Sequence, residues 1–152
     1  MIIKENESGR TMLEMLGVLA IMGVIMYGAI AGINFGLEMY KINATYNEIQ
    51  ELSKGIVDLY SWNRSYNGLN TNIVCENDIS DACTSTNQLF SKWHGEIAVN
   101  SYDSDRKFQI IYRRIDMLPC GRLLGMSYSY GELTSDHTPC QQQGNTLTFT
   151  SY

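Results

Sequence analysis

A single carboxylate, Glu14, stands directly before an apolar run that contains no charged residue, MLGVLAIMGVIMYGAIAGINFGL (Met15–Leu37). A charged side chain at the centre of a bilayer costs about 2.5–3.5 kcal/mol on insertion scales, so a carboxylate at that depth requires a cationic partner. We therefore predict that Glu14 takes part in an ion pair. The alternative is that it lies among the lipid headgroups and is simply solvated.

Four cysteines, all beyond the apolar run, are the second set of side chains that could do chemistry: Cys75, Cys83, Cys120 and Cys140. An even set in a small domain predicts disulfides and an oxidising compartment. No pair has the two-to-four-residue separation of a zinc knuckle, so a zinc site completed by His94 or His137 is the weaker interpretation. Three connectivities are open, and we predict the one that closes the shortest loops, Cys75 with Cys83 and Cys120 with Cys140.

Other candidates for catalysis or metal binding are weak. Asp103 and Asp105 supply two acids where Ca²⁺ needs six to eight oxygen ligands, and such a pair is more typical of a solvated turn. The sequence GMSYS (Gly125–Ser129) lacks the closing glycine of a nucleophile elbow. We expect no enzyme activity, no metal and no cofactor.

Charge and aromatic content also narrow the function. The formal net charge of -5 disfavours a general nucleic-acid binder, and Arg113, Arg114 and Arg122 form only a small basic cluster. Tyr128, Tyr130 and Tyr152 could stack on sugars or single-stranded DNA, but tyrosine in strands more often packs in the core.

The apolar run predicts a helix that is long enough to cross a hydrocarbon core of about 30 Å. Beyond it, side chains recur at mostly three- and four-residue spacing with polar residues such as Glu48 between them, which predicts an amphipathic helix: Leu37, Tyr40, Ile42, Tyr46, Ile49, Leu52, Ile56, Leu59 and Tyr60. No proline lies between Arg10 and Trp62, so the two stretches are expected to form one continuous helix of about 50 residues.

A cleaved secretory signal is the alternative, because Ala29-Ile30-Ala31 has the small-x-small form that signal peptidase accepts. The apolar run is longer than the roughly 7–15 residues of a signal's hydrophobic stretch, and it continues into the amphipathic segment. Both observations favour a retained helix.

Gly28, Gly32 and Gly36 recur every four residues, which makes one helix face smooth enough for close helix approach. Glycine is also simply tolerated in membrane helices, and Gly17 and Gly23 lie off this series. The series indicates helix packing without proving it.

The region after Trp62 predicts a small antiparallel sheet. Strands are expected at Gly95–Tyr102, Arg106–Arg114 and Asn145–Tyr152, because each alternates apolar and polar residues or is rich in β-formers. A short helix is expected within Asp116–Met126, although Pro119 and Gly121 fall inside it. The predicted fold is α+β, with the amphipathic half of the long helix packed on the sheet.

The sequence Gly9-Arg10-Thr11-Met12-Leu13-Glu14, followed directly by the apolar run, resembles the processing signature of type IV prepilins. The resemblance implies cleavage after Gly9 by a prepilin peptidase, methylation of the new amino group of Arg10, and pairing of Glu14 with the amino terminus of a neighbouring subunit. Arg10 stands where the family usually has phenylalanine or another apolar residue. The stretch from Cys120 to Cys140, with a final strand after it, is similar to the disulfide-bounded loop of pilins, particularly those grouped as type IVb.

The resemblance also implies a pilin-like organisation: a leader at 1–9 that is removed, a transmembrane and filament-core helix at 10–37, the amphipathic half of that helix at 38–63, and a globular head at 64–152. Its implied partners are copies of itself or other pilin subunits, the peptidase, the bacterial inner membrane and an assembly platform. The head is expected in the periplasm before the subunit joins an extracellular or periplasmic filament. Two rivals remain open: a membrane-anchored binding module that does not polymerise, and a secreted module released at Ala31.

Overall fold

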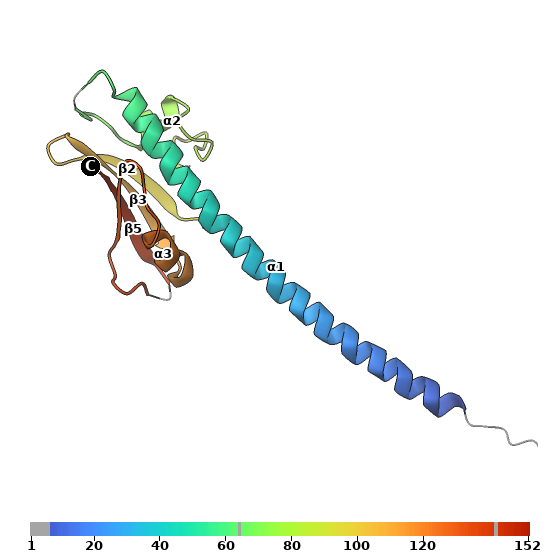
Figure 1. Cartoon of the computed structure of the whole chain (residues 1–152). Coiled ribbons are helices and arrows are strands. Elements are labelled where there is room, and N and C mark those ends of the chain that lie inside the picture. Colours follow the sequence, from blue (N-terminus) through green and yellow to red (C-terminus); the bar gives the residue numbers. More distant parts are fainter. Residues whose placement is uncertain (1–6, 64, 142) are drawn as a thin grey trace, which may run out of the picture. The chain divides into compact units, whose positions relative to one another are not determined.

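The computed structural model describes residues 7–63, 65–141 and 143–152, with side chains from Met12 onward. The chain divides into two compact units, Met1–Met39 and Tyr40–Tyr152. One helix, α1 (Glu7–Leu59), begins in the first unit and ends in the second (Figure 1). The prediction of one uninterrupted helix through both the apolar run and the amphipathic stretch is confirmed.

α1 ends at Leu59, earlier than the predicted end near Trp62. The residues that follow form turns, in which the amide of Ser61 donates to the carbonyl of Asp58 (3.3 Å) and the amide of Asn63 to that of Tyr60 (2.9 Å). These bonds span three residues instead of four, so the backbone leaves the α-helical path before the polar loop begins.

The second unit adds two short helices and five strands. In chain order they are α2 (Thr71–Glu76), β1 (Leu89–Phe90), β2 (Glu96–Tyr102), β3 (Lys107–Ile115), α3 (Met117–Leu124), β4 (Gly131–Ser135) and β5 (Asn145–Ser151). The strands form one sheet in the order β1-β2-β3-β5-β4, and every neighbouring pair is antiparallel. This is the α+β, pilin-like architecture that the sequence predicted.

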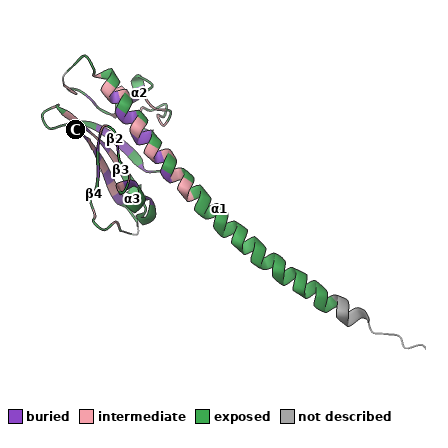
Figure 2. Cartoon of the chain, in the orientation of Figure 1, coloured by how far each residue is buried: buried purple, intermediate pink, exposed green. Residues whose placement is uncertain are grey.

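One face of the sheet forms the core, because alternate residues of paired strands lie in the same rows. Val99 pairs with Ile110, which pairs with Phe149, and all three are fully buried. The part of α1 beyond Met39 covers this face with Ile42, Ile49, Leu52 and Ile56, also buried (Figure 2). Side-chain contacts fix this packing, since the Tyr46 and Tyr128 rings lie 5.3 Å apart between centroids.

The opposite face of the sheet is more polar. Thr146, Thr148 and Thr150 of β5 alternate with the buried positions of that strand and are partly exposed. Such alternation is typical of an antiparallel sheet that is covered on one side only.

β3 contains an irregularity near its end that changes which side chains face outward. Its register against β5 shifts between Tyr112 and Ile115, and Arg114 has a left-handed backbone with φ 62°. Because of this bulge, Tyr112 and Ile115 are both fully buried while Arg113 and Arg114 are both exposed. Strict alternation would have placed Arg114 in the core.

The structure contains the predicted strands and the predicted short helix, together with elements that the sequence did not predict. The three predicted strands correspond to β2, β3 and β5, and the predicted short helix is α3. Pro119 is accommodated because it lies in the first turn of α3, where its missing amide has no helical partner to lose. α2, β1 and β4 were not predicted.

We predict that Gly131→Ala destabilises the second unit. Gly131 begins β4, and a Cβ there would meet the carbonyl oxygen of Thr150 and, at 2.6 Å, the ring of Phe149. Overpacking of this kind costs about 1–3 kcal/mol, so thermal unfolding of the full chain in detergent should shift downward by several degrees. Gly121→Ala is the matched control, since a Cβ at Gly121 meets open space in α3 and alanine favours helix. Equal melting temperatures for the two variants would contradict this account of the β4–β5 contact.

Candidate assembly site

The predicted processing site lies at the start of α1. Gly9 and Arg10 fall within the helical backbone of Glu7–Leu59, and their side chains lie outside the described residues, as does the leader through Asn6. Cleavage after Gly9 therefore stays a prediction from the sequence signature. Glu14 lies in the next turn and is exposed, and it forms no salt bridge with any residue that the structure describes.

The first unit presents a continuous apolar surface. The exposed large side chains of α1 before Met39 are Met12, Leu13, Met15, Leu16, Val18, Leu19, Ile21, Met22, Val24, Ile25, Met26, Tyr27, Ile30, Ile33, Phe35 and Leu37. α1 is long and apolar enough to cross a membrane, and none of its most apolar window is buried inside the chain. Since each large apolar side chain gains about 1.5–3 kcal/mol on burial, this surface requires an apolar environment from outside the chain.

Gly28, Gly32 and Gly36 lie within that surface. A Cβ built on any of them meets no atom within 4 Å, and the same holds for Gly17 and Gly23. No contact within the described part of the chain therefore requires glycine at these positions. The four-residue spacing leaves a shallow strip where the backbone of a second helix could approach closely.

The chain matches no family model, no curated protein and no solved structure.

The cysteines form the two pairs that the sequence favoured. Cys75 is bonded to Cys83, and Cys120 is bonded to Cys140. No cysteine is free, so neither pair has a thiolate to offer a metal. Among the described residues, no group of three or more histidine, cysteine or acidic side chains is placed to hold a metal ion.

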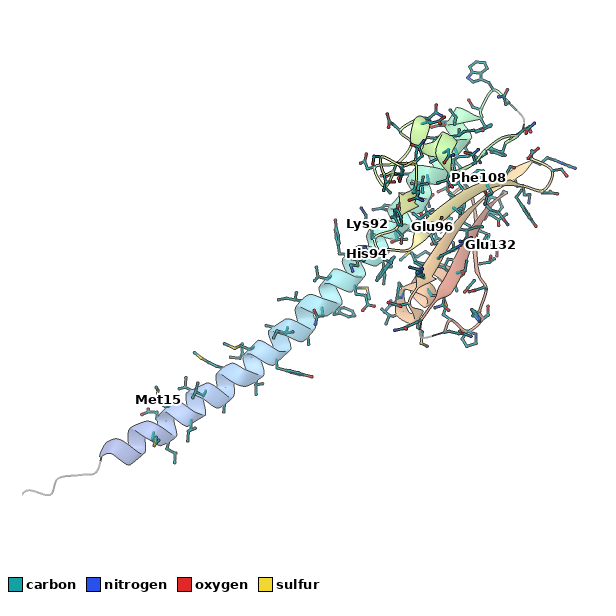
Figure 3. The ribbon with its side chains drawn as sticks, turned by 180° about the vertical axis from the view of Figure 1, so that it is seen from behind. Met15, Lys92, His94, Glu96, Phe108 and Glu132 are labelled. Carbon is teal, nitrogen blue, oxygen red and sulfur yellow. A yellow bond between two sulfur atoms is a disulfide. The ribbon has the colours of Figure 1, made fainter. Side chains whose placement is uncertain are left out.

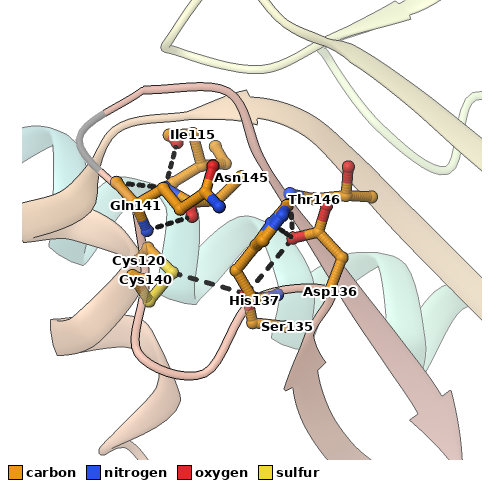
Figure 4. The surroundings of a disulfide bond; sticks show 9 residues. All are labelled: Ile115, Cys120, Ser135, Asp136, His137, Cys140, Gln141, Asn145 and Thr146. Atoms are coloured by element: carbon orange, nitrogen blue, oxygen red, sulfur yellow. Dashed lines mark hydrogen bonds and ion pairs between the residues drawn. A yellow bond between two sulfur atoms is a disulfide. The ribbon is translucent and has the colours of Figure 1, made fainter.

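A buried asparagine reinforces the loop that the second disulfide closes (Figure 4). Asn145 is fully buried at the start of β5, where its amide nitrogen donates to the carbonyls of Ile115 (2.9 Å) and Gln141 (2.8 Å). Its side-chain oxygen accepts from the amide of Gln141 (2.7 Å). The loop before β5 is thus held by a covalent bond to α3 and by polar contacts to Asn145 of β5, which is itself bonded to β3.

The other residues considered as candidate sites in the sequence lie in a turn or in the core. Asp103, Ser104 and Asp105 form the turn between β2 and β3 with left-handed φ values of 50°, 55° and 63°. The carbonyl of Asp105 accepts from the amide of Tyr66 (2.7 Å), and the carbonyl of Ser127 accepts from the hydroxyl of Tyr46 (3.0 Å). Tyr128 packs in the core, and its hydroxyl donates to the carbonyl of Leu123 (3.0 Å).

The burial of Glu48 differs from the prediction for the amphipathic stretch. Glu48 was placed among the polar residues of α1, yet its side chain is only 8% exposed. Neither carboxylate oxygen has a hydrogen-bond partner among the described residues, and the buried hydroxyl of Tyr112 also lacks one. Conversely, Tyr40 was counted with the apolar set and is 70% exposed.

Burial raises the pKa of Glu48 from 4.5 to about 7, while Lys92 acts to lower it and Glu51 to raise it. Burial, with Glu48 as a smaller cause, also raises the pKa of Tyr112 well above its usual value. The two groups therefore lie in one poorly solvated region between α1 and β3. No signal in the sequence separates Glu48 from the exposed acids of the same helix.

We predict that Glu48→Gln removes a pH-dependent loss of stability. The folded chain retains a proton on Glu48 that the unfolded chain releases near pH 4.5, so the free energy of unfolding falls as pH rises from about 4.5 through about 7. The shift corresponds to about 3 kcal/mol at most. Chemical unfolding at pH 4 and pH 8 should show the variant gaining on the wild type by about that amount at the higher pH.

Asp58→Asn is the matched control, because Asp58 is an exposed acid of the same helix and is not among the groups that act on the Glu48 carboxylate. It should leave the pH dependence unchanged. Parallel stability curves for Glu48→Gln and the wild type between pH 4.5 and 8 would show that Glu48 is ionised at little cost in the folded chain.

Proposed function

We propose that this chain is a structural subunit of a type IV pilus-like filament, cleaved after Gly9 and polymerising through the apolar part of α1. The observation that carries the proposal is the combination of the Gly9-to-Glu14 signature with a helix whose apolar side chains the rest of the chain leaves uncovered. The signature supports cleavage after Gly9. The uncovered surface supports burial of the apolar part of α1 against lipid or against other helices.

A lipid bilayer and a bundle of neighbouring helices would both cover that surface. A helix that only anchors the chain has no need of a carboxylate beside its apolar run, since lipid tails offer no partner to it. A bundle of processed subunits does supply one, because cleavage after Gly9 creates an ammonium group on Arg10. Glu14 therefore favours assembly over simple anchoring.

The partner of Glu14 is placed most easily on another subunit. Within one helix the new amino terminus is fixed about 6 Å from Glu14 along the axis, so full neutralisation of the carboxylate is easier from another subunit. An adjacent subunit displaced along the filament axis can bring its amino terminus to the carboxylate. Because this contact joins two different surfaces, repeated addition generates an open helical assembly.

The proposed partners follow from this pathway. A prepilin peptidase cuts the chain in the bacterial inner membrane, an assembly platform extracts it, and identical or related subunits bury its helix. The two disulfides support a head in the periplasm, where oxidation occurs before assembly. The glycine strip supports close helix packing in the filament core.

We predict that Gly9→Leu blocks processing. A peptidase that cuts at this junction must bring its catalytic groups close to the backbone, and a bulky side chain before the scissile bond obstructs that approach. The intact mass of the membrane-bound protein should remain that of the precursor. Gly17→Leu changes a glycine of the same helix beyond the junction and should mature normally, whereas a normal mature mass for Gly9→Leu would disprove the assigned cut.

We predict that Glu14→Leu is processed and retained in the membrane but assembles poorly. The substitution makes α1 more apolar, so insertion is not impaired, yet it leaves a buried ammonium without its partner, a loss of about 3–5 kcal/mol. The measurement is the yield of sheared filaments from cells that lack the wild-type copy.

Glu38→Leu provides the control, because it makes the same change at the other end of the apolar run. It should assemble at close to the wild-type yield. Equal filament yields from Glu14→Leu and the wild type would disprove the proposed role of Glu14. If both proteins matured and neither the variant nor the wild type formed filaments, the chain would be a membrane anchor.

A further inference from the structure

A second site, unrelated to assembly, lies where the β1–β2 turn meets the bulge of β3. The side chains of Gln88, Phe90, His94, Glu96, Arg113 and Arg114 line a pocket of about 290 Å³. Phe90 pairs with Glu96 across the first two strands, and Glu96 contacts Arg113 on the next strand at 3.5 Å. The pocket therefore lies on the polar face of the sheet, opposite the core.

The bulge gives this pocket its second arginine. Because Arg114 adopts φ 62°, its side chain is exposed alongside that of Arg113 instead of pointing into the core. A left-handed backbone is unfavourable for a residue with a Cβ, and such residues concentrate at ligand-binding positions. His94, labelled in Figure 3 together with Glu96, is also left-handed, with φ 60°, and lines the same pocket.

The turn that carries His94 is held firmly against β3. The amide of Ser91 donates to the carbonyl of Gly95 (2.9 Å), and the amide of Gly95 donates to the hydroxyl of Ser91 (3.2 Å). A Cβ on Gly95 would collide with the carbonyl oxygen of Arg113, so the turn approaches the strand as closely as glycine permits. The backbone of the turn that carries His94 is thus positioned before any ligand arrives.

Charge determines what the pocket can accept. Arg113 is paired with Glu96, both more than half exposed, whereas Arg114 and His94 form no salt bridge within the described part of the chain. Lys92 of the same turn acts on Glu48, on the core side of the sheet. Two guanidinium groups against one carboxylate leave a formal excess of one positive charge, which a singly charged anion balances and a phosphate dianion exceeds.

We propose that this pocket binds the carboxylate of a small organic acid. The planar guanidinium of Arg114 offers parallel N–H donors that match the two oxygens of a carboxylate. The ring of His94 and the amide of Gln88 offer further donors, and the half-exposed ring of Phe90 offers an apolar wall to the body of the ligand. Acidic sugars and aromatic acids share this chemistry.

The test is a titration of the full chain in detergent micelles, followed by the amide NMR signals of Phe90, His94 and Gly95. The probes are sodium glucuronate and sodium benzoate, with glucose and benzyl alcohol as their uncharged counterparts and inorganic phosphate as the alternative anion. We expect saturable shifts with at least one carboxylate, with a dissociation constant on the order of 1 mM, and none with the uncharged compounds. Saturation by glucuronate alone would identify acidic sugars, and by benzoate alone aromatic acids.

Two variants locate the site. Arg114→Asn removes the charge at a position whose left-handed backbone asparagine tolerates, and it should weaken carboxylate binding by roughly tenfold or more. His94→Asn should weaken it less. Arg106→Gln, at an exposed arginine of the β2–β3 turn, is the matched control and should bind as the wild type does. Non-saturating shifts, tighter binding of phosphate than of either carboxylate, or equal binding by Arg114→Asn with its spectrum otherwise preserved would overturn the proposal.

Discussion

The second unit depends on one layer of contact, between the apolar stripe of α1 beyond Met39 and a single face of the sheet. Neither surface is stable in water by itself: the helix offers Ile49, Leu52 and Ile56, and the sheet offers the rows that contain Ile110 and Phe149. Each fully buried side chain of this kind contributes about 1.5–3 kcal/mol. The short helices extend this layer at its borders with buried side chains of their own, among them Val74 of α2 and Leu123 of α3.

The sequence predicted the elements whose residues repeat with a clear period. β5 alternates buried and partly exposed residues along its whole length, and α1 has no proline in any position. The motif from Gly9 to Glu14 is also visible in the sequence, because its residues are close in the chain, and the cleavage and ion pair that it predicts stay predictions. The disulfide pairing followed from loop length alone.

Elements and sites that depend on distant partners were missed. β4 begins with a buried glycine and spans only Gly131–Ser135, too little for a pattern to emerge. Thr45 is fully buried although polar, because its hydroxyl accepts from the ring nitrogen of Trp93 (3.0 Å), and buried Ser53 donates to the carbonyl of Ile49 (2.6 Å) in its own helix. The pocket beside Arg114 was equally hidden, since it combines three strands and a bulge that appears only when β3 pairs with β5.

The strand order limits how readily the edges of the sheet can pair with strands of other molecules. The two outermost strands, β1 and β4, are short, and an outer strand exposes backbone groups that can pair with another molecule. β1 offers only two residues, and β4 places the charged, exposed Glu132 between buried positions. Neither strand is a good template for adding a foreign one. The sheet is therefore protected against continuous β-aggregation, in which strands of many copies would share backbone hydrogen bonds.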